Sequence, residues 1–480
     1  MKKTMIQQTC RPLLLASALT ALLAGCATTP SADPAADLRV ATQYGRGDAT
    51  ANAPAQSVER ELTAPPAEVR ADAWWQGFAD PRLDQLIERV LDSNTDMASA
   101  GLKLERARVQ AGLAGADLWP QAAGSVSANG SRSIDTGDDW SRGNSASVSL
   151  GWELDLWGKL RGQRDIARWE AQATAQDLQG TVLSLIGQSC ELYWQLGYLN
   201  QAIATGQANL ERLERTASLV QTQFDAGAVS RLEVRQARQN IESQRAAQAQ
   251  LEQQRVETRN ALTVLLDGKP WPQADEPQNL DVTHSPGIAE GLPAELLARR
   301  PDLRAAELRL RQSLAGIKVT ATSYYPSLSL SSSIGSSSPS LADVLTNPMA
   351  TLGAGLSLPF LKFRQMQLDI DSADLSYQIA ANDFRRTLYT ALSEVDNALS
   401  ARTRLAEQVA AAQASHDEAV QIARLYEVRY RAGATDLRTW LEAEQTRRNA
   451  ELSLAQVKRS QLVNDVTLYK ALGGGAQQTQ

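Results

Sequence analysis

Two segments of this chain, DMASAGLKL at residues 96–104 and DLRAAELRL at residues 302–310, resemble each other, and their first positions, 96 and 302, differ by 206. Pro120 and Pro326, which follow the two segments, keep the same separation. A fixed offset between similar segments is the signature of a duplicated structural unit. The fold is therefore expected to contain two copies of one unit.

The duplication sets the expected domain organisation. It predicts a first repeat at residues 71–272, a connector at residues 273–300 and a second repeat at residues 301–474. The last residues, 475–480, are expected to form a disordered tail.

The first 25 residues have the composition of a signal peptide, with Lys and Arg before a short apolar run that ends in the tetrad LAGC at Cys26. This tetrad resembles the lipobox of bacterial lipoproteins. The resemblance implies that residues 1–25 are removed, that Cys26 is acylated and, with Ala27 next, that the protein is sorted to the outer membrane. Residues 26–70 are expected to be an extended tether. The alternative is an ordinary secretory signal with an unmodified cysteine.

The composition argues against several function classes. The formal charge of −6 is unfavourable for a broad nucleic-acid-binding surface. The two histidines, His284 and His416, do not lie in a metal-ligand spacing, and the chain has no phosphate-binding glycine loop and no nucleophile motif. Cys190 lies in a helical pattern and is expected to be a small core residue. We therefore expect no enzyme activity, no cofactor and no metal site.

An alternation of apolar and polar residues predicts a β-strand at residues 145–156. Residues 121–133 alternate more weakly, so a β-hairpin is expected at about residues 121–157. The second copy repeats the pattern and predicts a hairpin at about residues 326–360. Each chain would contribute four strands with one apolar and one polar face.

A long helical stretch follows each predicted β-hairpin. Apolar residues spaced by three and four predict a coiled-coil seam, and a helix of about 68 residues would extend roughly 100 Å. Gly227 and Gly433 are suited to end the two helices with a positive φ, and Ser230 begins a capping-box pattern. These signals predict long helical hairpins at about residues 158–267 and 363–472.

Four strands cannot close into a barrel, and an open sheet with an apolar outer face would leave unpaired backbone groups in a bilayer. Closure therefore needs several chains. Two chains would give eight strands with a filled lumen, and three would give twelve with open space. The Ser-rich polar face suits a wet lumen, and Trp and Tyr near the strand ends suit a membrane interface. The alternative is a small soluble β-sandwich on a helical stalk.

Several motifs together resemble the outer membrane factor family, the TolC-like efflux ducts, and its NodT-like lipoprotein branch. These motifs are Trp74-Trp75 with Phe78 and Asp80-Pro81, NAL at residues 260–262, WELDLWG at residues 152–158, DLRAAE at residues 302–307, YPSL at residues 325–328 and ALGG at residues 471–474. The resemblance covers about residues 70–475. It implies a mainly α-helical chain with a membrane β-barrel, in which a homotrimer forms a 12-stranded barrel and an α-helical periplasmic tunnel.

The same resemblance implies a periplasmic gate at the tips of the helical hairpins. Tyr430 occupies the family's gate-tyrosine position, and Glu442 occupies an acidic constriction position, where a ring of carboxylates would favour cations. At the other acidic position this chain has Thr439, and Asp436, one turn earlier, is the candidate replacement. The alternative is that Asp436 and Glu442 are solvated acids favoured by the helix dipole.

These features lead to the expectation of an outer membrane channel in a tripartite efflux system. The chain would be a passive exit duct for small molecules such as drugs and toxic compounds. An inner-membrane pump, of the resistance-nodulation-division type, would drive it through a periplasmic adaptor protein, and outer membrane lipid would surround the barrel. Two alternatives remain: the duct of a type I protein secretion system, and a structural periplasmic coiled-coil lipoprotein without a pore.

Overall fold

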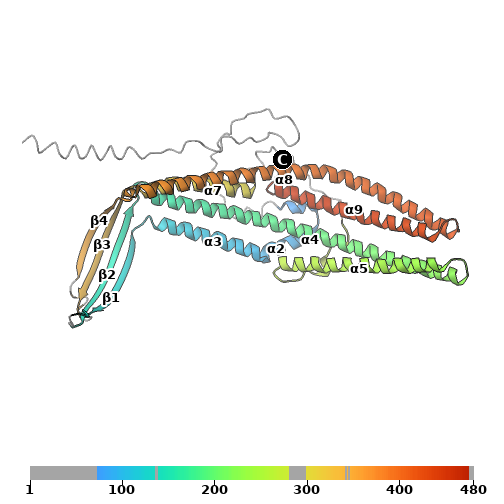
Figure 1. The fold of residues 1–480 in the computed structure, drawn as a ribbon, viewed down its shortest axis with the longest axis horizontal. Helices are drawn as coiled ribbons and strands as arrows, with labels where there is room; N and C mark the ends of the chain where they lie inside the picture. Colours follow the sequence, from blue (N-terminus) through green and yellow to red (C-terminus); the bar gives the residue numbers. More distant parts are fainter. Residues whose placement is uncertain are drawn as a thin grey trace, which may run out of the picture. The chain divides into compact units, whose positions relative to one another are not determined.

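The computed structural model describes residues 73–135, 139–280, 299–340, 343, 346 and 348–474. These residues form mainly α-helices and one four-stranded antiparallel sheet (Figure 1). The predicted signal peptide, Cys26, the tether and the tail at 475–480 lie outside the described residues, as do His284 and most of the connector.

The described elements of the first repeat begin with a short 3-10 helix and end with another. In chain order they are η3 (Trp74–Phe78), α2 (Pro81–Ser93), α3 (Thr95–Ala116), β1 (Gln121–Ser131), β2 (Ser141–Leu154), α4 (Lys159–Asp225), α5 (Arg231–Leu265) and η4 (Gln273–Asp275). The second repeat follows the same plan, with α7 (Pro301–Ser323), β3 (Ser327–Ser338), β4 (Met349–Ser357), η5 (Pro359–Leu361), α8 (Phe363–Arg431) and α9 (Leu437–Ala471).

The two repeats share a matching tertiary contact at their return helices. Asn94 Nδ2 donates to the Leu265 carbonyl at the end of α5 over 3.0 Å, and Arg300 Nη1 donates to the Ala471 carbonyl at the end of α9 over 3.0 Å. Each pair is separated by 171 residues. Both contacts supply a donor to a carbonyl in the last turn of a helix, where no backbone partner follows. The duplication therefore preserves a contact although the residue types differ.

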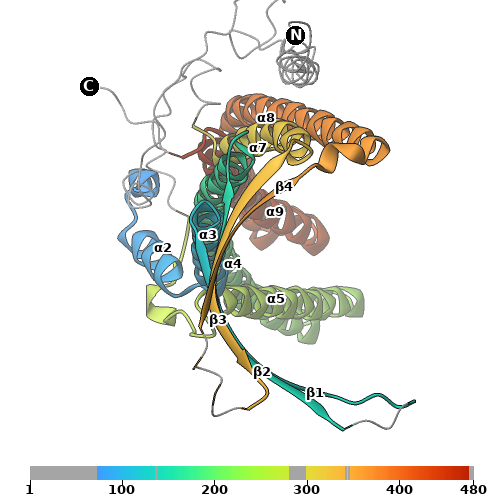
Figure 2. The ribbon, with the colours of Figure 1, turned by 90° about the vertical axis from the view of Figure 1, so that its left-hand side faces the viewer.

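The sheet joins the two repeats, because its strand order is β1-β2-β3-β4 and the central pair comes from different repeats (Figure 2). Ser147 lies opposite Ser125 on β1 and Gly335 on β3. One face carries apolar side chains that are exposed in this chain, with Val148 62% and Leu352 85% exposed. A single chain therefore leaves the apolar face of its sheet uncovered.

The long helices bury the apolar seam that their spacing predicts. Helix α4 packs against α3, α5, α7 and α9, and α8 packs against α7 and α9. In α4, the seam residues that become buried are Val182, Leu185, Leu196, Leu199, Ile203 and Val220. None of the helices in the described part of the chain combines the length and apolarity needed to cross a membrane. The burial follows one apolar stripe along each helix, as the spacing predicts.

Aromatic residues before α2 pack against helices of both repeats. Trp74 stacks on Tyr469 of α9 with ring centroids 4.7 Å apart, and Phe78 meets the edge of Trp194 of α4 at 4.9 Å. Cys190 is fully buried and unpaired in the same region of α4. Burying these large rings stabilises the contact between the first and second repeats about midway along the long helices.

Candidate functional site

The candidate site follows the chain from the polar face of the sheet, through the junction between strands and helices, to the turns of the helical hairpins. The polar face is rich in hydroxyl groups. Facing hydroxyls pair across β1 and β2, with Ser125 and Ser147 2.8 Å apart and Ser127 and Ser145 2.8 Å apart. Such a face can be wetted without fixed charge.

The four strands carry two charged side chains, Arg142 and Glu153. Glu153 lies on the polar face at the helical end of β2 and pairs with Lys159 of α4 at 2.5 Å. Arg142 lies at the other end of the strand, with the parity of the apolar face. The middle of the polar face is therefore uncharged, so it would discriminate weakly between cations and anions.

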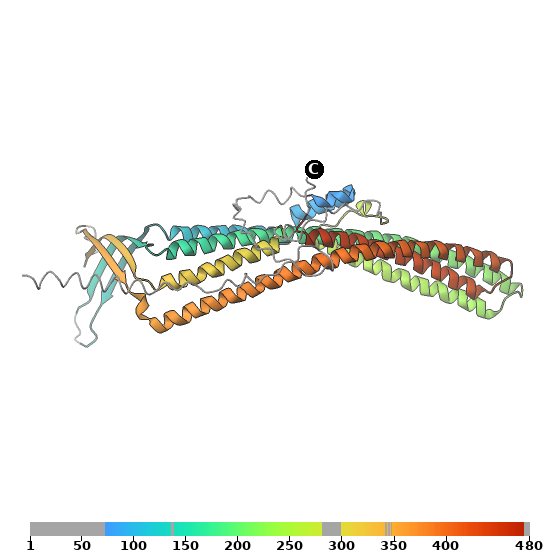
Figure 3. The ribbon, with the colours of Figure 1, turned by 90° about the horizontal axis from the view of Figure 1, so that it is seen from above.

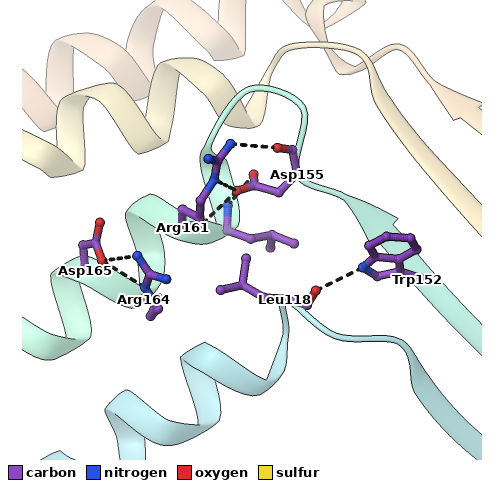
Figure 4. A network of polar contacts seen from close by, with 7 residues as sticks. Leu118, Trp152, Asp155, Arg161, Arg164 and Asp165 are labelled. Carbon is purple, nitrogen blue, oxygen red and sulfur yellow. Dashed lines mark hydrogen bonds and ion pairs between the residues drawn. The ribbon is translucent and has the colours of Figure 1, made fainter.

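Asp155 fixes the junction between β2 and α4 (Figure 4). Its carboxylate accepts hydrogen bonds from the backbone N–H of Leu160 and of Arg161, both at 3.0 Å, and from Arg161 Nε at 2.9 Å. These bonds cap a helix whose N-cap residue, Gly158, has a positive φ of 77° and no side chain to contribute. Although burial raises the pKa of Asp155, the bonds from Arg161 and Leu160 outweigh burial and lower that pKa from its usual 3.8.

The alternating pattern places Asp155 on the polar face of a strand that continues to residue 156. The structure ends β2 at Leu154 and uses Asp155 as a helix cap instead. The residue type is informative here, because Asp shortly before a helix start is a capping signal. Period-2 alternation alone hides this signal.

Two tryptophans tie the junction to neighbouring segments. Trp152 Nε1 donates to the Leu118 carbonyl at 3.0 Å, and Trp157 Nε1 donates to the Pro326 carbonyl at 2.7 Å. The ring of Trp157 also meets the ring of Tyr325 edge-on at 5.4 Å. The contacts of Trp157 join the two repeats, and the bond of Trp152 ties β2 to the segment after α3 within the first repeat.

The turns of the two helical hairpins have matching backbone geometry. Gly227 and Gly433 have φ values of 77° and 72°, and each turn closes with a backbone bond of 2.8 Å, from Ala228 to Gln223 and from Ala434 to Arg429. This is the Schellman arrangement that favours glycine. Ser230 then starts α5 in a capping box with the side chain of Glu233.

Tyr430 lies at the contact between the two hairpins. The turns of both hairpins lie at the same end of the long helices (Figure 3). The Tyr430 hydroxyl donates to Gln223 Oε1 of α4 at 2.9 Å, and its ring stacks on Trp440 of α9 with centroids 5.1 Å apart. Burial, with a contribution from the charge of Glu233, raises the pKa of the Tyr430 phenol, so it remains a neutral donor. Val220, Val234 and Leu437 complete the apolar cluster around it.

The two candidate acids lie on α9 and at its start. Asp436 is the N-cap of α9 and accepts from the Thr439 backbone N–H at 2.7 Å, a bond that lowers the pKa of its carboxyl. Glu442 is exposed and pairs with Arg438 of its own helix at 2.7 Å. Thus the structure joins Tyr430 to the first hairpin, whereas Asp436 and Glu442 make contacts within the second.

Among the residues that the structure describes, no group of three or more His, Cys, Asp and Glu side chains could hold a metal ion. His416 lies beside Asp417, at 3.3 Å. The sheet, the junction and the hairpin turns thus define a class of protein, in which each chain supplies a four-stranded sheet with one polar face, joined to long helical hairpins.

Comparison with known proteins agrees with this class. The family model of the outer membrane efflux protein matches residues 86–268 and again residues 292–474. The antibiotic efflux pump outer membrane protein ArpC of Pseudomonas putida is 30% identical over 472 residues, covering 96% of this chain and 95% of the relative. The pyoverdine export outer membrane protein OpmQ of Pseudomonas putida is 33% identical over 419 residues, covering 84% and 88%.

Among solved structures, the open state of the Neisseria gonorrhoeae MtrE outer membrane channel matches with a TM-score of 0.75 and 27% identity, covering 91% of this chain and 98% of that one. The chain belongs to the outer membrane efflux protein family. It is the outer membrane component of an efflux system, as the sequence predicted. The family and fold are those of channel proteins.

The capping role of Asp155 leads to a pH-dependent prediction. Asp155→Asn should destabilise the protein by about 1–3 kcal/mol at neutral pH, because charge-assisted bonds to two backbone N–H groups and one guanidinium are weakened. The folded-state pKa lies below 3.8, so the carboxylate's contribution is present above that value and is lost as pH falls through the folded pKa. The measurement is the thermal midpoint of both proteins in detergent from pH 7 downward.

The matched control is Asp117→Asn, whose exposed carboxylate accepts one bond from Gln121 Nε2 at 2.9 Å. It should lower the midpoint much less. A gap between wild type and Asp155→Asn that is equally wide at acid and neutral pH would contradict the capping role.

Proposed function

We propose that three copies of this chain assemble into a passive exit duct for small molecules across the outer membrane. The observation that carries the proposal is the unfinished sheet. In the described part of the chain, β1 pairs with β2 alone and β4 pairs with β3 alone, so each end of the sheet presents an edge. A bilayer does not tolerate unpaired backbone groups, so other chains must satisfy these edges.

The number of chains follows from the polar face. Two chains would close a barrel of eight strands, and side chains would fill its interior. Three chains would close a barrel of twelve strands around open space. The hydroxyl-rich face of this sheet suits contact with water rather than a packed interior. The α4 and α8 helices, of 67 and 69 residues, would continue the duct over roughly 100 Å.

The partners follow from the position of the helical turns, at the opposite end of the long helices from the strands. In the proposal, a periplasmic adaptor protein meets these turns, formed around Gly227, Ser230 and Gly433, and links them to an inner-membrane pump of the resistance-nodulation-division type. The printed names of the relatives, which concern an antibiotic efflux pump and pyoverdine export, support small molecules as cargo. Acylation of Cys26 would add a lipid anchor in the outer membrane.

The assembly can be tested directly with the purified full-length protein in detergent. We expect a mass of three chains by light scattering or native mass spectrometry, and single-channel conductance after reconstitution into planar bilayers. Monodisperse single chains that conduct ions would contradict the proposal. Stable trimers without conductance would instead support a structural coiled-coil lipoprotein.

The periplasmic mouth is proposed to be held closed by Tyr430. Its bond to Gln223 and its stacking on Trp440 connect the two hairpins of one chain. Three copies of Glu442, or of Asp436, would add a ring of carboxylates at the mouth, which attracts cations. Asp436 also caps α9, so Glu442 is the acid that can be altered without removing a helix cap.

The gate proposal predicts different effects for two variants, one on the resting conductance and one on block by cations. Tyr430→Phe removes the hydroxyl bond and should raise the resting conductance severalfold, since a lost neutral hydrogen bond is worth about 0.5–1.5 kcal/mol. Glu442→Ala should leave the hairpins together but weaken block by multivalent cations added from the periplasmic side. Single-channel recording measures both. Tyr389→Phe, on the exposed surface of the same helix, is the control, and an effect equal to that of Tyr430→Phe would contradict the gate.

The uncharged polar face gives a further prediction with a neighbouring control. Ser333 lies opposite Ser149 and Thr351, so Ser333→Asp should place three carboxylates around the lumen and make the channel distinctly cation-selective, seen as a shifted reversal potential. Ser332 lies opposite Leu150 and Leu352 on the apolar face, so Ser332→Asp should impair membrane assembly instead. If Ser332→Asp changed the ion selectivity and Ser333→Asp impaired assembly, the assignment of the lumen to the face of Ser333 would be wrong.

A further inference from the structure

A polar layer lies between the two helical hairpins, away from their turns. On the first hairpin it contains Asn209 of α4 and Gln244 of α5, which are 5% and 4% exposed. On the second hairpin it contains Arg448 of α9, which is half-buried. Arg448 follows Trp440 by eight positions, about 12 Å along the helix, so the layer is separate from the Tyr430 cluster. Buried polar groups at this depth need partners.

Gln244 lies at the centre of the layer. Its Nε2 donates to the Gly206 carbonyl at 3.2 Å, and its Oε1 accepts from Asn209 Nδ2 at 3.1 Å. The guanidinium of Arg448 also donates to Oε1 of Gln244. A side chain at Gly206 would collide with the amides of Gln244 and Gln248. The absence of a side chain at Gly206 therefore makes room for the amide of Gln244, which in turn contacts Arg448 of the other hairpin.

A second contact crosses the same boundary within one turn of the first. Thr205 Oγ1 of α4 donates to Glu451 Oε1 of α9 at 2.8 Å. The other oxygen of Glu451 pairs with Arg447 at 3.1 Å, which holds the carboxylate in place. The residues Thr205, Gln244, Arg448 and Glu451 are called the clasp below.

The clasp holds a cation with neutral acceptors. Arg448 donates to the amide oxygens of Gln244 and Gln445, and no ion pair of Arg448 occurs among the described residues. Burial and the neighbouring charge of Arg447 lower the pKa of Arg448. Separating the hairpins would exchange the hydrogen bond from Arg448 to Gln244 for hydrogen bonds to water, so the net contribution of that bond to the closed state is modest. The clasp is thus specific in geometry but easily released.

We propose that the clasp is a second latch of the periplasmic mouth, acting on the same two hairpins as Tyr430 but independently of it. This inference rests on the proposed gating by hairpin separation. The mouth opens only when the second hairpin leaves both Gln223, which Tyr430 of α8 contacts, and the face of Thr205 and Gln244, which α9 contacts. Thr205, Gln244, Arg448 and Glu451 are therefore positioning residues that set the population of the closed state.

The test measures the distance between the hairpin turns in the intact trimer. Ala228→Cys and Ala434→Cys, both at exposed turn positions, carry spin labels for electron–electron resonance, and the buried Cys190 remains unlabelled. Thr205→Val, which exchanges a hydroxyl for a methyl group, and Arg448→Met, which keeps the stem, each remove one contact. Each should increase the population with separated turns and the resting conductance about three- to tenfold, the effect of one lost hydrogen bond.

Two controls separate a latch from general destabilisation. Thr205→Ser keeps the hydroxyl and should behave like wild type. Arg404→Ala breaks an exposed ion pair of 2.8 Å with Glu407 within α8 alone and should leave the distance unchanged. Combining Thr205→Val with Tyr430→Phe should multiply the two increases, because independent latches act on one equilibrium.

The outcomes distinguish the latch from the gate. If Tyr430→Phe separates the turns while Thr205→Val and Arg448→Met leave distance and conductance unchanged, the latch is wrong and the gate at Tyr430 stands. If the clasp variants separate the turns and Tyr430→Phe does not, the clasp is the principal latch. If no variant separates the turns, both the latch and gating by hairpin separation are wrong. Thr205→Val decides the matter alone should Arg448→Met fail to assemble.

Discussion

The backbone groups on the outer edges of β1 and β4 must find hydrogen-bond partners, and much of this protein depends on that requirement. A four-stranded sheet with an exposed apolar face is unsuited to water and unsuited to a bilayer as long as its edges are open. Joining sheets edge to edge satisfies both demands at once. The same closure would place the hydroxyl-rich faces around a common space. A channel of this kind is therefore a property of the assembly and not of one chain.

The long helices raise a different problem, because a helix of nearly 70 residues has far too little stability of its own to stay straight in water. Its stability comes from a narrow apolar stripe packed along neighbouring helices. That packing also joins the repeats, through Trp74 on Tyr469, and the indole bond of Trp157 to the Pro326 carbonyl joins them near the sheet. Towards the turns, the contacts between the hairpins include polar ones, from Tyr430 to Gln223 and from Thr205 to Glu451. They are therefore the contacts most easily exchanged for water, which suits a mouth that opens.

The duplication conserves geometry more strictly than chemistry. Asn94 and Arg300 are different residues, yet each donates to a carbonyl in the last turn of its own return helix over 3.0 Å. The two junctions differ more. Asp155 caps α4, whereas α8 begins without a side-chain cap and is tied instead by the Tyr324 hydroxyl, which donates to Asp369. The two repeats therefore fix equivalent helix starts with different contacts.

The sequence alone determined the repeat, the strand and helix types, the turns at Gly227 and Gly433 and the family, because these depend on local periodicity, on glycine's access to positive φ and on motifs. It also located Tyr430, although only by resemblance. Tertiary structure decided that Gln223 is the partner of Tyr430, that Asp155 leaves the strand to cap a helix, and that Gly206 makes room for the amide of Gln244. Those facts depend on which residues distant in the chain come within 3–4 Å, and no local pattern records that distance.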